Sequence, residues 1–306
     1  MILRVLVIVG CLAVALLQAV PSSGQVESRL AAYTGRNAAG YLEPLVDAFN
    51  ILLNSGRFHS ARIYDHGISI SLECNYMYAY FEDEDRTFTA TTEHGFQPEQ
   101  TAIAPTVIGA KEVVYVEGQA GTRYAFPGGF DLRSFSFAAP QIRVGSLYGT
   151  EALFRFLFIN TGADDLGSFT LYGAGLRHDI SRYTRDMLPL DISAGFLWQR
   201  FTLGESKGGD DLLTANAFSL GFQAGRKLRM MEPYAGLSYD TFTMDVSYSD
   251  GSVDSSNAVD LSLESSAHLH LVLGLSLNLA FVTIQSEFNI ATQNAYSIGL
   301  SFHYTH

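Results

Sequence analysis

Residues 267–306 read AHLHLVLGLSLNLAFVTIQSEFNIATQNAYSIGLSFHYTH and alternate apolar with small or polar side chains. Leucine occupies every second position at the start of this stretch, at Leu269, Leu271, Leu273, Leu275 and Leu277. Successive side chains of a β-strand point to opposite faces, so this period of two predicts a strand rather than a helix. The same alternation returns over residues 282–290 and 296–304. The stretch therefore predicts three strands, each with one apolar and one polar face.

An apolar strand face meets the core in a soluble sandwich and lipid in a membrane barrel, and the composition favours the second case. Only 16% of the 306 residues are charged, against about 25% in an average soluble domain. The 28 Gly, 21 Phe and 16 Tyr residues suit close strand packing and aromatic belts, and they argue against disorder. The net charge of -12 argues against a nucleic-acid partner, because no basic surface would neutralise phosphates.

The first 24 residues predict a secretory signal peptide. Arg4 precedes an apolar run over residues 5–17, and small residues follow, which suits cleavage after Ala19 or Gly24. No later run reaches the roughly 18 apolar residues of a transmembrane helix, so strands remain the route through a bilayer. Cleavage would leave Cys74 as the only cysteine, which excludes an internal disulfide and favours a small buried hydrophobic side chain.

Residues 25–62 predict a short helical segment ahead of a barrel that spans residues 63–306. Leu42, Leu45, Phe49 and Leu52 recur at helical spacing. Pro44 suits a first turn, and Gly56 is a helix stop. Two positions for this helix remain open: a cap beneath the barrel on the periplasmic side, or a plug within its lumen.

Alternating segments predict an all-β fold, an antiparallel transmembrane barrel of about twelve strands, with a range of 10–14. Two of the twelve, over 86–94 and 106–116, lie in a stretch interrupted by Pro, Gly and Gln. A shift in the pattern near Asp240 predicts a β-bulge. Placing the C-terminus in the periplasm puts the longer, acidic connections outside and the short ones inside, except for 291–293. The outer connections are 82–85, 161–165, 204–211 and 249–258, and the inner ones are 147–149, 228–231 and 279–280.

The last strand carries a pattern typical of the C-terminal assembly signal of outer-membrane barrels. Ser297, Gly299, Phe302 and Tyr304 follow the order polar, glycine, hydrophobic, hydrophobic, and two residues trail beyond it. These four residues predict contact with the barrel-assembly machinery, in addition to outer-membrane lipid around the barrel.

Several segments resemble an uncharacterised family of predicted outer-membrane β-barrels of Gram-negative bacteria. They are YLEPLVDAFNILLNSGRFHSA (41–61), FEDEDRTF (81–88), APTVIG (104–109), PQIRVGSLYGTEALFRF (140–156), GLRHDISRY (175–183) and LPLDISAGFLWQRFTLG (188–204). The resemblance covers nearly the whole chain and implies a barrel in the outer membrane, with no known activity. More distantly, the signal peptide, helix and barrel resemble the long-chain fatty-acid transporter family, at the level of architecture alone.

The polar strand faces supply the candidate lumen-lining residues. They are Glu73, Asp191, Gln199, Gln223, His268, His270, Gln285, Glu287 and Asn289, and Glu151, Arg155 and Asp240 join them. A His268, His270 and Glu287 group has metal-ligand chemistry, yet such residues also fill a barrel interior with hydrogen bonds, which is the simpler interpretation. No catalytic pair and no cofactor site is expected, because no GxSxG elbow or nucleophile–base pair occurs.

These observations predict an outer-membrane barrel that binds or passes a small solute, including a hydrophobic one. A non-conducting structural or docking barrel is the alternative, and a lipase-type enzyme is the third class. A barrel of this size lies between filled eight-stranded barrels and open porins, so the sequence leaves an open or plugged lumen undecided.

Overall fold

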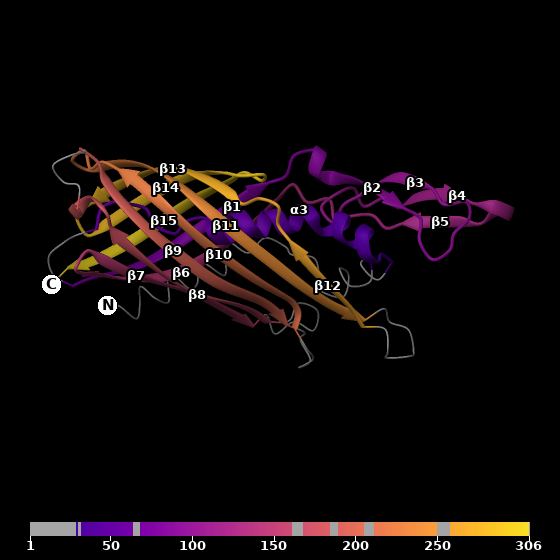
Figure 1. The fold of residues 1–306 in the computed structure, drawn as a ribbon, viewed down its shortest axis with the longest axis horizontal. Coiled ribbons are helices and arrows are strands. Elements are labelled where there is room, and N and C mark those ends of the chain that lie inside the picture. Colours follow the sequence, from indigo (N-terminus) through magenta and orange to yellow (C-terminus); the bar gives the residue numbers. More distant parts are fainter. Residues whose placement is uncertain are drawn as a thin grey trace.

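The computed structural model describes residues 29, 32–63, 68–160, 168–183, 189–204, 211–249 and 258–305. The predicted signal peptide lies outside the described residues. Ten antiparallel strands close into a barrel (Figure 1), because β10 pairs with β11 and β1 pairs with β15. They are β1 (Ser69–Tyr80), β6 (Ser134–Leu147), β7 (Thr150–Asn160), β8 (Ser168–Asp179), β9 (Asp191–Gly204), β10 (Asp211–Gly225), β11 (Met231–Ser249), β13 (Leu269–Leu279), β14 (Val282–Ile290) and β15 (Ala295–Thr305).

The wall has ten strands, which is two fewer than the twelve counted from the sequence and the lower limit of the predicted range of 10–14. The difference lies between β1 and β6. Residues 81–133, here called the arm, form two separate hairpins that project from one end of the barrel (Figure 1). These are β2 (Thr87–Thr91) with β3 (Thr101–Pro105), and β4 (Val114–Glu117) with β5 (Arg123–Phe126). Strands of four or five residues are too short to join a wall, because a tilted strand needs about 9–11 residues to cross a bilayer.

The two ends of the barrel differ in their connections. At the end opposite the arm, the turn end, 148–149, 226–230 and 280–281 join their strands with two to five residues, and 180–190 is a longer connection between β8 and β9. At the arm end the connections include the arm itself and 250–257. Positive φ at Tyr148 (52°) and Gly149 (72°) forms a tight two-residue turn between β6 and β7. The outer and periplasmic sides of these ends remain a prediction.

An additional strand, β12 (Ala258–Glu264), extends the wall at the arm end. β12 pairs with β11 from Thr243 towards the arm end, and β13 pairs with β11 from Tyr239 towards the turn end. Together β12 and β13 therefore occupy the place of one wall strand with an interruption. The N–H of Asp240 donates to the carbonyl of His268 at 2.8 Å within that interruption. The predicted bulge near Asp240 is therefore on the partner strand, while β11 keeps its alternation of inward and outward residues throughout.

The faces of β11 exchange polarity at the same level. Up to Asp240, the buried inward residues of β11 are mostly polar. From Phe242 towards the arm end, the buried inward residues are apolar. Outside, the exposed residues are apolar up to Tyr239 and polar at Asp245. The shift in the sequence pattern near Asp240 therefore reflects an exchange of polar and apolar residues between the two faces of β11, and not an extra residue in that strand.

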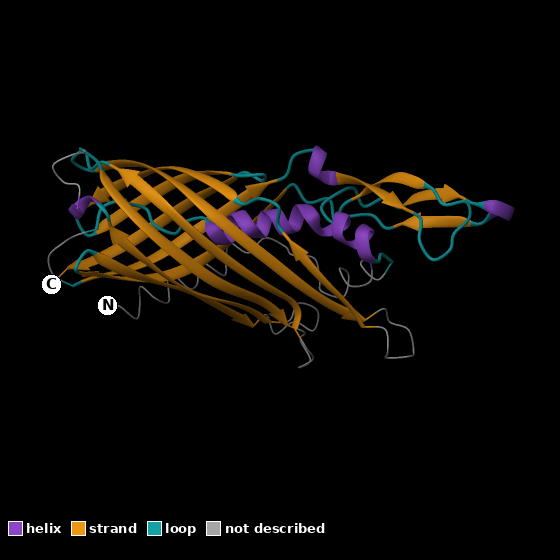
Figure 2. Cartoon of the chain, viewed as in Figure 1, coloured by secondary structure: helices purple, strands orange, loops and turns teal. Residues whose placement is uncertain are grey.

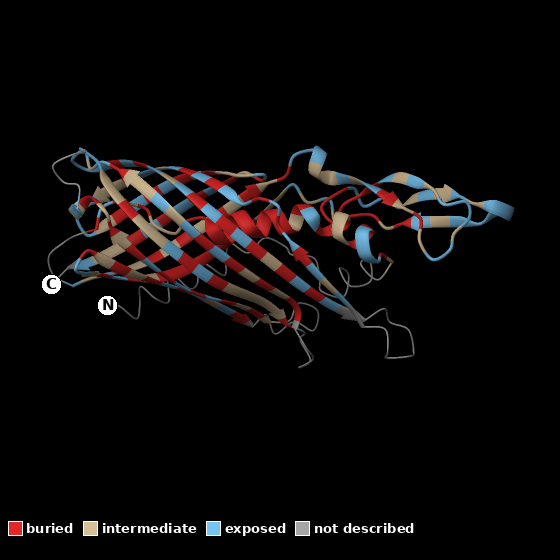
Figure 3. Ribbon diagram, in the orientation of Figure 1, coloured by how far each residue is buried: buried red, intermediate tan, exposed pale blue. Residues whose placement is uncertain are grey.

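Other strands follow the same rule, and the result is an apolar outer belt around a polar lumen. On β10, Ala217 is buried and Phe218 begins the exposed apolar run. On β1, the inward residues change from Glu73 and Asn75 to Met77. Along the barrel wall, Figure 3 shows buried and exposed residues alternating.

Helix α3 (Gly35–Asn54) runs from the arm into the barrel rather than beneath it (Figure 2). The structure therefore places the helix within the lumen, where a cap would lie outside it. The helix starts earlier than its spacing predicts, so Pro44 lies inside it and not in the first turn. The carbonyl of Tyr41, three positions before this proline, accepts a hydrogen bond from the N–H of Val107 in the arm at 2.9 Å. Gly56, with φ +62°, follows the helix end as predicted.

The arm-side half of the helix holds the arm in place. Asn37 forms two hydrogen bonds with the backbone of Thr91, donating to its carbonyl at 2.6 Å and accepting from its N–H at 3.0 Å. Tyr41 donates to the carbonyl of Gly128 at 3.2 Å, and burial raises the pKa of this phenol to about 12. The arm thus packs on the helix that plugs the barrel.

None of the described helices is long and apolar enough to cross a membrane.

Candidate functional site

The site begins where the helix ends inside the lumen. Residues 50–62, here called the lumen segment, contain the last turn of α3 and the irregular chain that follows it. Arg155 of β7 is 1% exposed, and its guanidinium donates to the carbonyls of Leu53 (2.9 Å), Ser55 (3.0 Å) and Gly56 (2.9 Å). A cation at a helix C-terminus satisfies the terminal carbonyls and complements the helix dipole.

The amides of two glutamines orient Arg155. The side-chain oxygen of Gln141 on β6 accepts from Nε at 3.1 Å and from Nη2 at 2.9 Å. Gln199 on β9 accepts from Nη1 at 3.0 Å, and its amide nitrogen donates to the Leu53 carbonyl at 2.5 Å. Both glutamine oxygens thus accept from the arginine that holds the helix end.

Other strands hold the lumen segment from the opposite side. Glu287 of β14 accepts from the N–H of Gly56 at 2.9 Å, and Asn75 of β1 donates to the Gly56 carbonyl at 3.0 Å. Earlier in the segment, Asn50 of the helix donates to the Ser265 hydroxyl and the Ala267 carbonyl, both at 2.9 Å. The helix end is thus anchored to strands all round the wall.

The chain after the helix is bound in the same way as it descends towards the turn end. Arg57 donates to Ser219 and to Ser238, the latter at 3.0 Å. Further hydrogen bonds join Gln223 to the Phe58 carbonyl (2.7 Å), Ser276 to the His59 carbonyl, Arg177 to the Ser60 carbonyl, and Ser60 to Glu232. Backbone carbonyls of the segment accept three of these six bonds, so the wall holds the backbone of the segment as well as its side chains.

A row of alternating charges lies on the wall near the turn end. In this charge ladder (Glu73, Arg143, Glu151 and Arg177), Arg143 lies 2.6 Å from Glu73 and 3.2 Å from Glu151, and Arg177 lies 2.5 Å from Glu151. All four residues are at most 7% exposed. Pairing with opposite charge allows such groups to remain buried.

Next to the ladder, His59 of the lumen segment lies 2.6 Å from Arg143. This contact brings the irregular chain against the charge ladder.

A second polar cluster surrounds His270. Its Nδ1 lies 2.8 Å from the Asp240 carboxylate, and its Nε2 lies 3.0 Å from the Asn289 side-chain oxygen. The hydroxyl of Ser219 donates to the other oxygen of Asp240. Serine and histidine thus both contact the aspartate, which ties β10, β11, β13 and β14 together.

Most of the predicted lumen residues point inward. Glu73, Gln199, His270, Gln285, Glu287 and Asn289 are buried, Gln223 is half-buried against the lumen segment, and Asp191 is half-buried at the turn end. His268 differs from the prediction, because it is exposed and its ring stacks on Tyr239 with the centroids 5.2 Å apart. The interruption between β12 and β13 turns this residue outward.

The metal group suggested by His268, His270 and Glu287 is therefore not assembled. Glu287 binds Gly56, Tyr234 and Ser297, and His270 binds Asp240 and Asn289. Among the described residues, no three His, Cys, Asp or Glu side chains group as metal ligands.

The sequence predictions missed the two arginines of the charge ladder, Arg143 and Arg177. Both occupy inward positions of alternating strands, Arg143 between Ile142 and Val144, and Arg177 next to Leu176. Strict alternation would have found them, since an arginine between outward apolar residues faces the lumen.

Gly299 has a structural role in the seam between the first and last strands. Asn75 of β1 and Gln285 of β14 lie opposite Gly299 on either side of β15. Their amides meet across the glycine, with Gln285 donating to Asn75 at 2.8 Å, and a Cβ at this position would overlap both. The glycine of the predicted assembly pattern thus lets the flanking strands bond across the last one.

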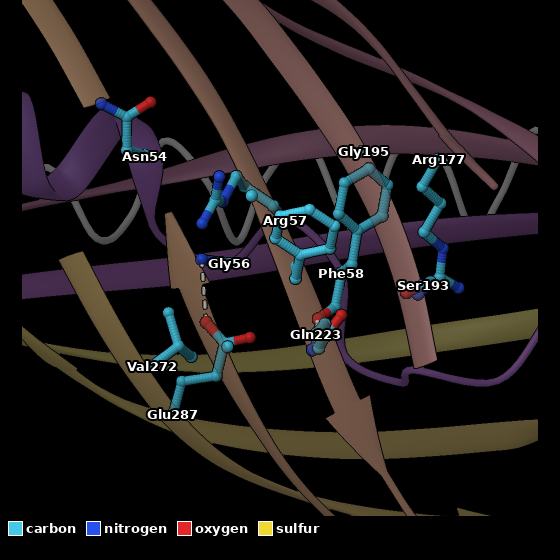
Figure 4. Close-up of a pocket in the computed structure, with 13 residues that line it drawn as sticks. Asn54, Gly56, Arg57, Phe58, Arg177, Ser193, Gly195, Gln223, Val272 and Glu287 are labelled. Atoms are coloured by element: carbon cyan, nitrogen blue, oxygen red, sulfur yellow. Dashed lines mark hydrogen bonds between the residues drawn. The ribbon is translucent and has the colours of Figure 1, made fainter. Parts of the chain in front are cut away.

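The lumen segment borders open space among the described residues. One small cavity of about 40 Å³ lies beside Asn54, Arg57 and Phe58 (Figure 4), against a wall of small residues that includes Gly195 and Gly221. In Figure 4 the dashed line joins Gly56 to Glu287, the bond that closes one side of this space. Another cavity, of about 230 Å³, opens at the turn end beside the charge ladder.

Among solved structures, the chain is similar to the β domain of the Bordetella autotransporter BrkA, with 9% identity, a TM-score of 0.36, and coverage of 79% of this chain and 100% of that one. It is also similar to Ail of Yersinia pestis (10% identity, TM-score 0.30, 78% and 99% covered) and to the Ralstonia pickettii toluene transporter TbuX (10% identity, TM-score 0.27, 79% and 90% covered). TM-scores this low do not establish a shared fold, so the barrel assignment rests on the sheet of this chain.

No curated protein matches the chain. The resemblance to the long-chain fatty-acid transporter family is not shown by these comparisons. A family model does match residues 2–304, which is nearly the full length, and its description is that of a family of unknown function. The chain therefore belongs to the family of unknown function DUF6588.

Proposed function

We propose that this protein is an outer-membrane β-barrel that is closed by its own lumen segment and acts as a docking barrel, with the arm as the docking element outside the membrane. This is the non-conducting alternative raised by the sequence. The proposal has three parts: a membrane location, a closed lumen and an exposed arm. Each part is supported by a different observation.

The membrane location is supported by the exchange of polarity along the wall. On β11, the outward residues between Thr241 and the turn end are apolar, such as Leu237. Those between Thr241 and the arm end are polar, such as Asp245. A soluble barrel has no physical reason to expose an apolar belt on one part of its outer face and polar residues on the rest, whereas a membrane barrel does. Ten strands also satisfy the even count of bacterial outer-membrane barrels.

The single observation that carries the closed state is the attachment of the lumen segment. Arg155, Gln199, Asn75 and Glu287 bind its helix end from four different strands, and further bonds follow its descent. Burying so many polar groups is favourable only when they are paired, and here the segment supplies the partners. A conducting lumen would leave these wall groups without them.

Passage of a hydrophobic solute is the weaker alternative, because the lumen wall below the helix is polar and charged. We propose no catalytic step. We also propose that Ser297, Gly299, Phe302 and Tyr304 of β15 serve as the assembly signal, since these residues occupy the closing strand.

The docking role requires the arm to be outside the cell, and protease shaving of intact cells tests this. Lys111 and Arg123 are exposed in the arm, and Arg226 and Arg229 are exposed at the turn end. We expect trypsin added to whole cells to cut at the arm and to spare the turn end. Cleavage at the turn end in intact cells, or recovery of the protein in the soluble periplasm, would contradict the proposal.

The closed state is tested separately by planar-bilayer recordings of the full-length protein. We expect no stable single-channel steps from the wild type. Steady conductance in the wild type would favour the solute-passing alternative over a docking barrel.

A further inference from the structure

A groove at the arm end lies between helix α3, strand β2 of the arm and strand β12, which runs beside the helix (Figure 1). Ala39 and Val46 belong to the face of α3 that lines it. Thr89 of β2 lines one side, and Leu263 and Glu264 of β12 line the other. Its volume of about 420 Å³ is far more than a single water molecule needs.

The edge of β12 that faces away from β11 is unpaired among the described residues. The N–H of Ser265, just after β12, donates to the carbonyl of Phe242 on β11 at 3.2 Å. Residues of an antiparallel strand point their backbone groups towards and away from a given neighbour in turn. The N–H and C=O groups that point away from β11 are therefore those of Asp260, Ser262 and Glu264.

Strand β2 presents a second unpaired edge to the same groove. Asn37 of α3 bonds to both backbone groups of Thr91, as a neighbouring strand would. Thr89, two residues earlier, points its backbone groups in the same direction, and the described residues offer them no partner. Open strand edges of this kind are templates for the addition of another strand.

The side chains of β12 define what an added strand should carry. Leu261 and Leu263 face the barrel interior, where they pack in the apolar core around α3. Asp260, Ser262 and Glu264 are exposed on the other face. Opposite charges on neighbouring strands stabilise a sheet and like charges destabilise it. The complementary strand therefore alternates apolar with basic residues, whereas a second copy of β12 would bring carboxylates together.

We propose that this groove binds an extended segment of a partner protein, with alternating apolar and basic residues, which adds as a strand to the free edge of β12. Main-chain hydrogen bonds would provide affinity, and the alternating side chains would provide specificity. The outward residues of β12 are polar, so the groove lies in water beyond the apolar belt. The inference rests on the proposed docking role and names the class of partner.

The probe is a fluorescent peptide of alternating valine and lysine, as long as the seven residues of β12. It is titrated into the full-length protein in nanodiscs of zwitterionic lipid, and binding is measured by fluorescence anisotropy. An alternating valine–glutamate peptide is the reference. Ser262→Pro removes an N–H from the free edge, whereas Ser262→Ala keeps it. Both variants lose the hydroxyl bond to Asp245, so they are matched.

We expect saturable binding of the valine–lysine peptide by the wild type and by Ser262→Ala. Ser262→Pro should weaken it by about tenfold or more, because the edge loses a hydrogen bond and gains a ring. Glu264→Lys should weaken binding by about three- to tenfold through like charges on adjacent strands. Glu112→Lys makes the same change at an exposed arm position outside the groove lining and should have no effect.

Equal binding by Ser262→Pro and Ser262→Ala would overturn the proposal, because the backbone edge would then play no part. Equal binding of the valine–glutamate peptide would overturn it too. A wild-type dimer that Ser262→Pro dissociates would place a second copy on the edge instead of a basic partner. Heat-modifiable migration on gels shows whether each variant has folded, and where Ser262→Pro has not, Glu264→Lys against Glu112→Lys decides.

Failure of this inference is distinguishable from failure of the docking role. If the peptide does not bind while trypsin still cuts the arm on intact cells, the groove is not the docking surface and the docking role stands. Cleavage at the turn end overturns the docking role whether or not the peptide binds.

Discussion

Replacing Arg155 with alanine should release the lumen segment while leaving the barrel wall intact. Arg155 donates to carbonyls of the helix end and to the amide oxygens of Gln141 and Gln199. After truncation, the Leu53 carbonyl keeps Gln199 as a donor and the Gly56 carbonyl keeps Asn75. The Ser55 carbonyl and the two glutamine oxygens lose every donor that the described residues provide.

The size of the effect follows from these three acceptors. A buried acceptor left without a partner costs roughly 1–3 kcal/mol, which gives about 3–9 kcal/mol for the three. Removing a buried charge also removes its desolvation penalty, so the lower end, about 3 kcal/mol, is the better expectation. That energy corresponds to a factor of about 10² in the ratio of bound to released lumen segment.

Hydrogen–deuterium exchange of the full-length protein measures this directly. We expect peptides covering residues 50–62 to exchange about 10² times faster in Arg155→Ala than in the wild type, and peptides from β13 to β15 to remain protected. Arg200→Ala is the matched control, because it removes an arginine that is not buried from β9, which is separated from β7 by one strand. Bilayer recordings of Arg155→Ala should show brief openings.

Unchanged exchange of residues 50–62 in Arg155→Ala would refute the reasoning, since the guanidinium would then contribute nothing to closure. Equal acceleration in Arg200→Ala would refute it as well. Arg155→Met keeps most of the side-chain volume and separates loss of hydrogen bonds from loss of packing.

The remaining predictions concern the seam and the arm. Gly299→Ala should slow barrel assembly and lower the unfolding temperature measured by heat-modifiability gels, because the new Cβ overlaps the Asn75 and Gln285 amides. Gly236→Ala is the control and should have little effect, because the nearest atom to its Cβ is 3.3 Å away. An equal fall in unfolding temperature in both variants would contradict the role of Gly299 in the seam. Asn37→Ala should weaken the packing of the arm on α3 by about 1–3 kcal/mol, because it removes both of its hydrogen bonds to the Thr91 backbone. The expected readout is faster proteolysis within 81–133, and an unchanged rate would contradict this prediction. Because burial raises the pKa of Tyr41, its neutral phenol stabilises the arm below pH 10, and this contribution is lost as pH rises to about 12. Proteolysis of the arm should therefore accelerate over this range more steeply in the wild type than in Tyr41→Phe.

Alternation located the lumen wall because it reports directly on which side of a strand each residue lies. Glu287 and Asn289 point inward for this reason, and so do the two arginines that were overlooked. Alternation assigns His268 to the wrong face, since the interruption between β12 and β13 exchanges the two faces of the strand. It also failed in the arm, where five-residue alternating segments resemble wall strands in pattern and differ only in length.

The sequence by itself determined the class of fold, the outward apolar face of the closing strands and the helix that ends before Gly56. These properties depend on the period of side chains along a single segment, which is local information. The tertiary structure alone decided that the barrel has ten strands, that the helix lies in the lumen and that Arg155 caps it. Those features depend on contacts between residues about 100 positions apart, such as Arg155 and Ser55, and no local pattern records which distant acceptor a buried donor will meet.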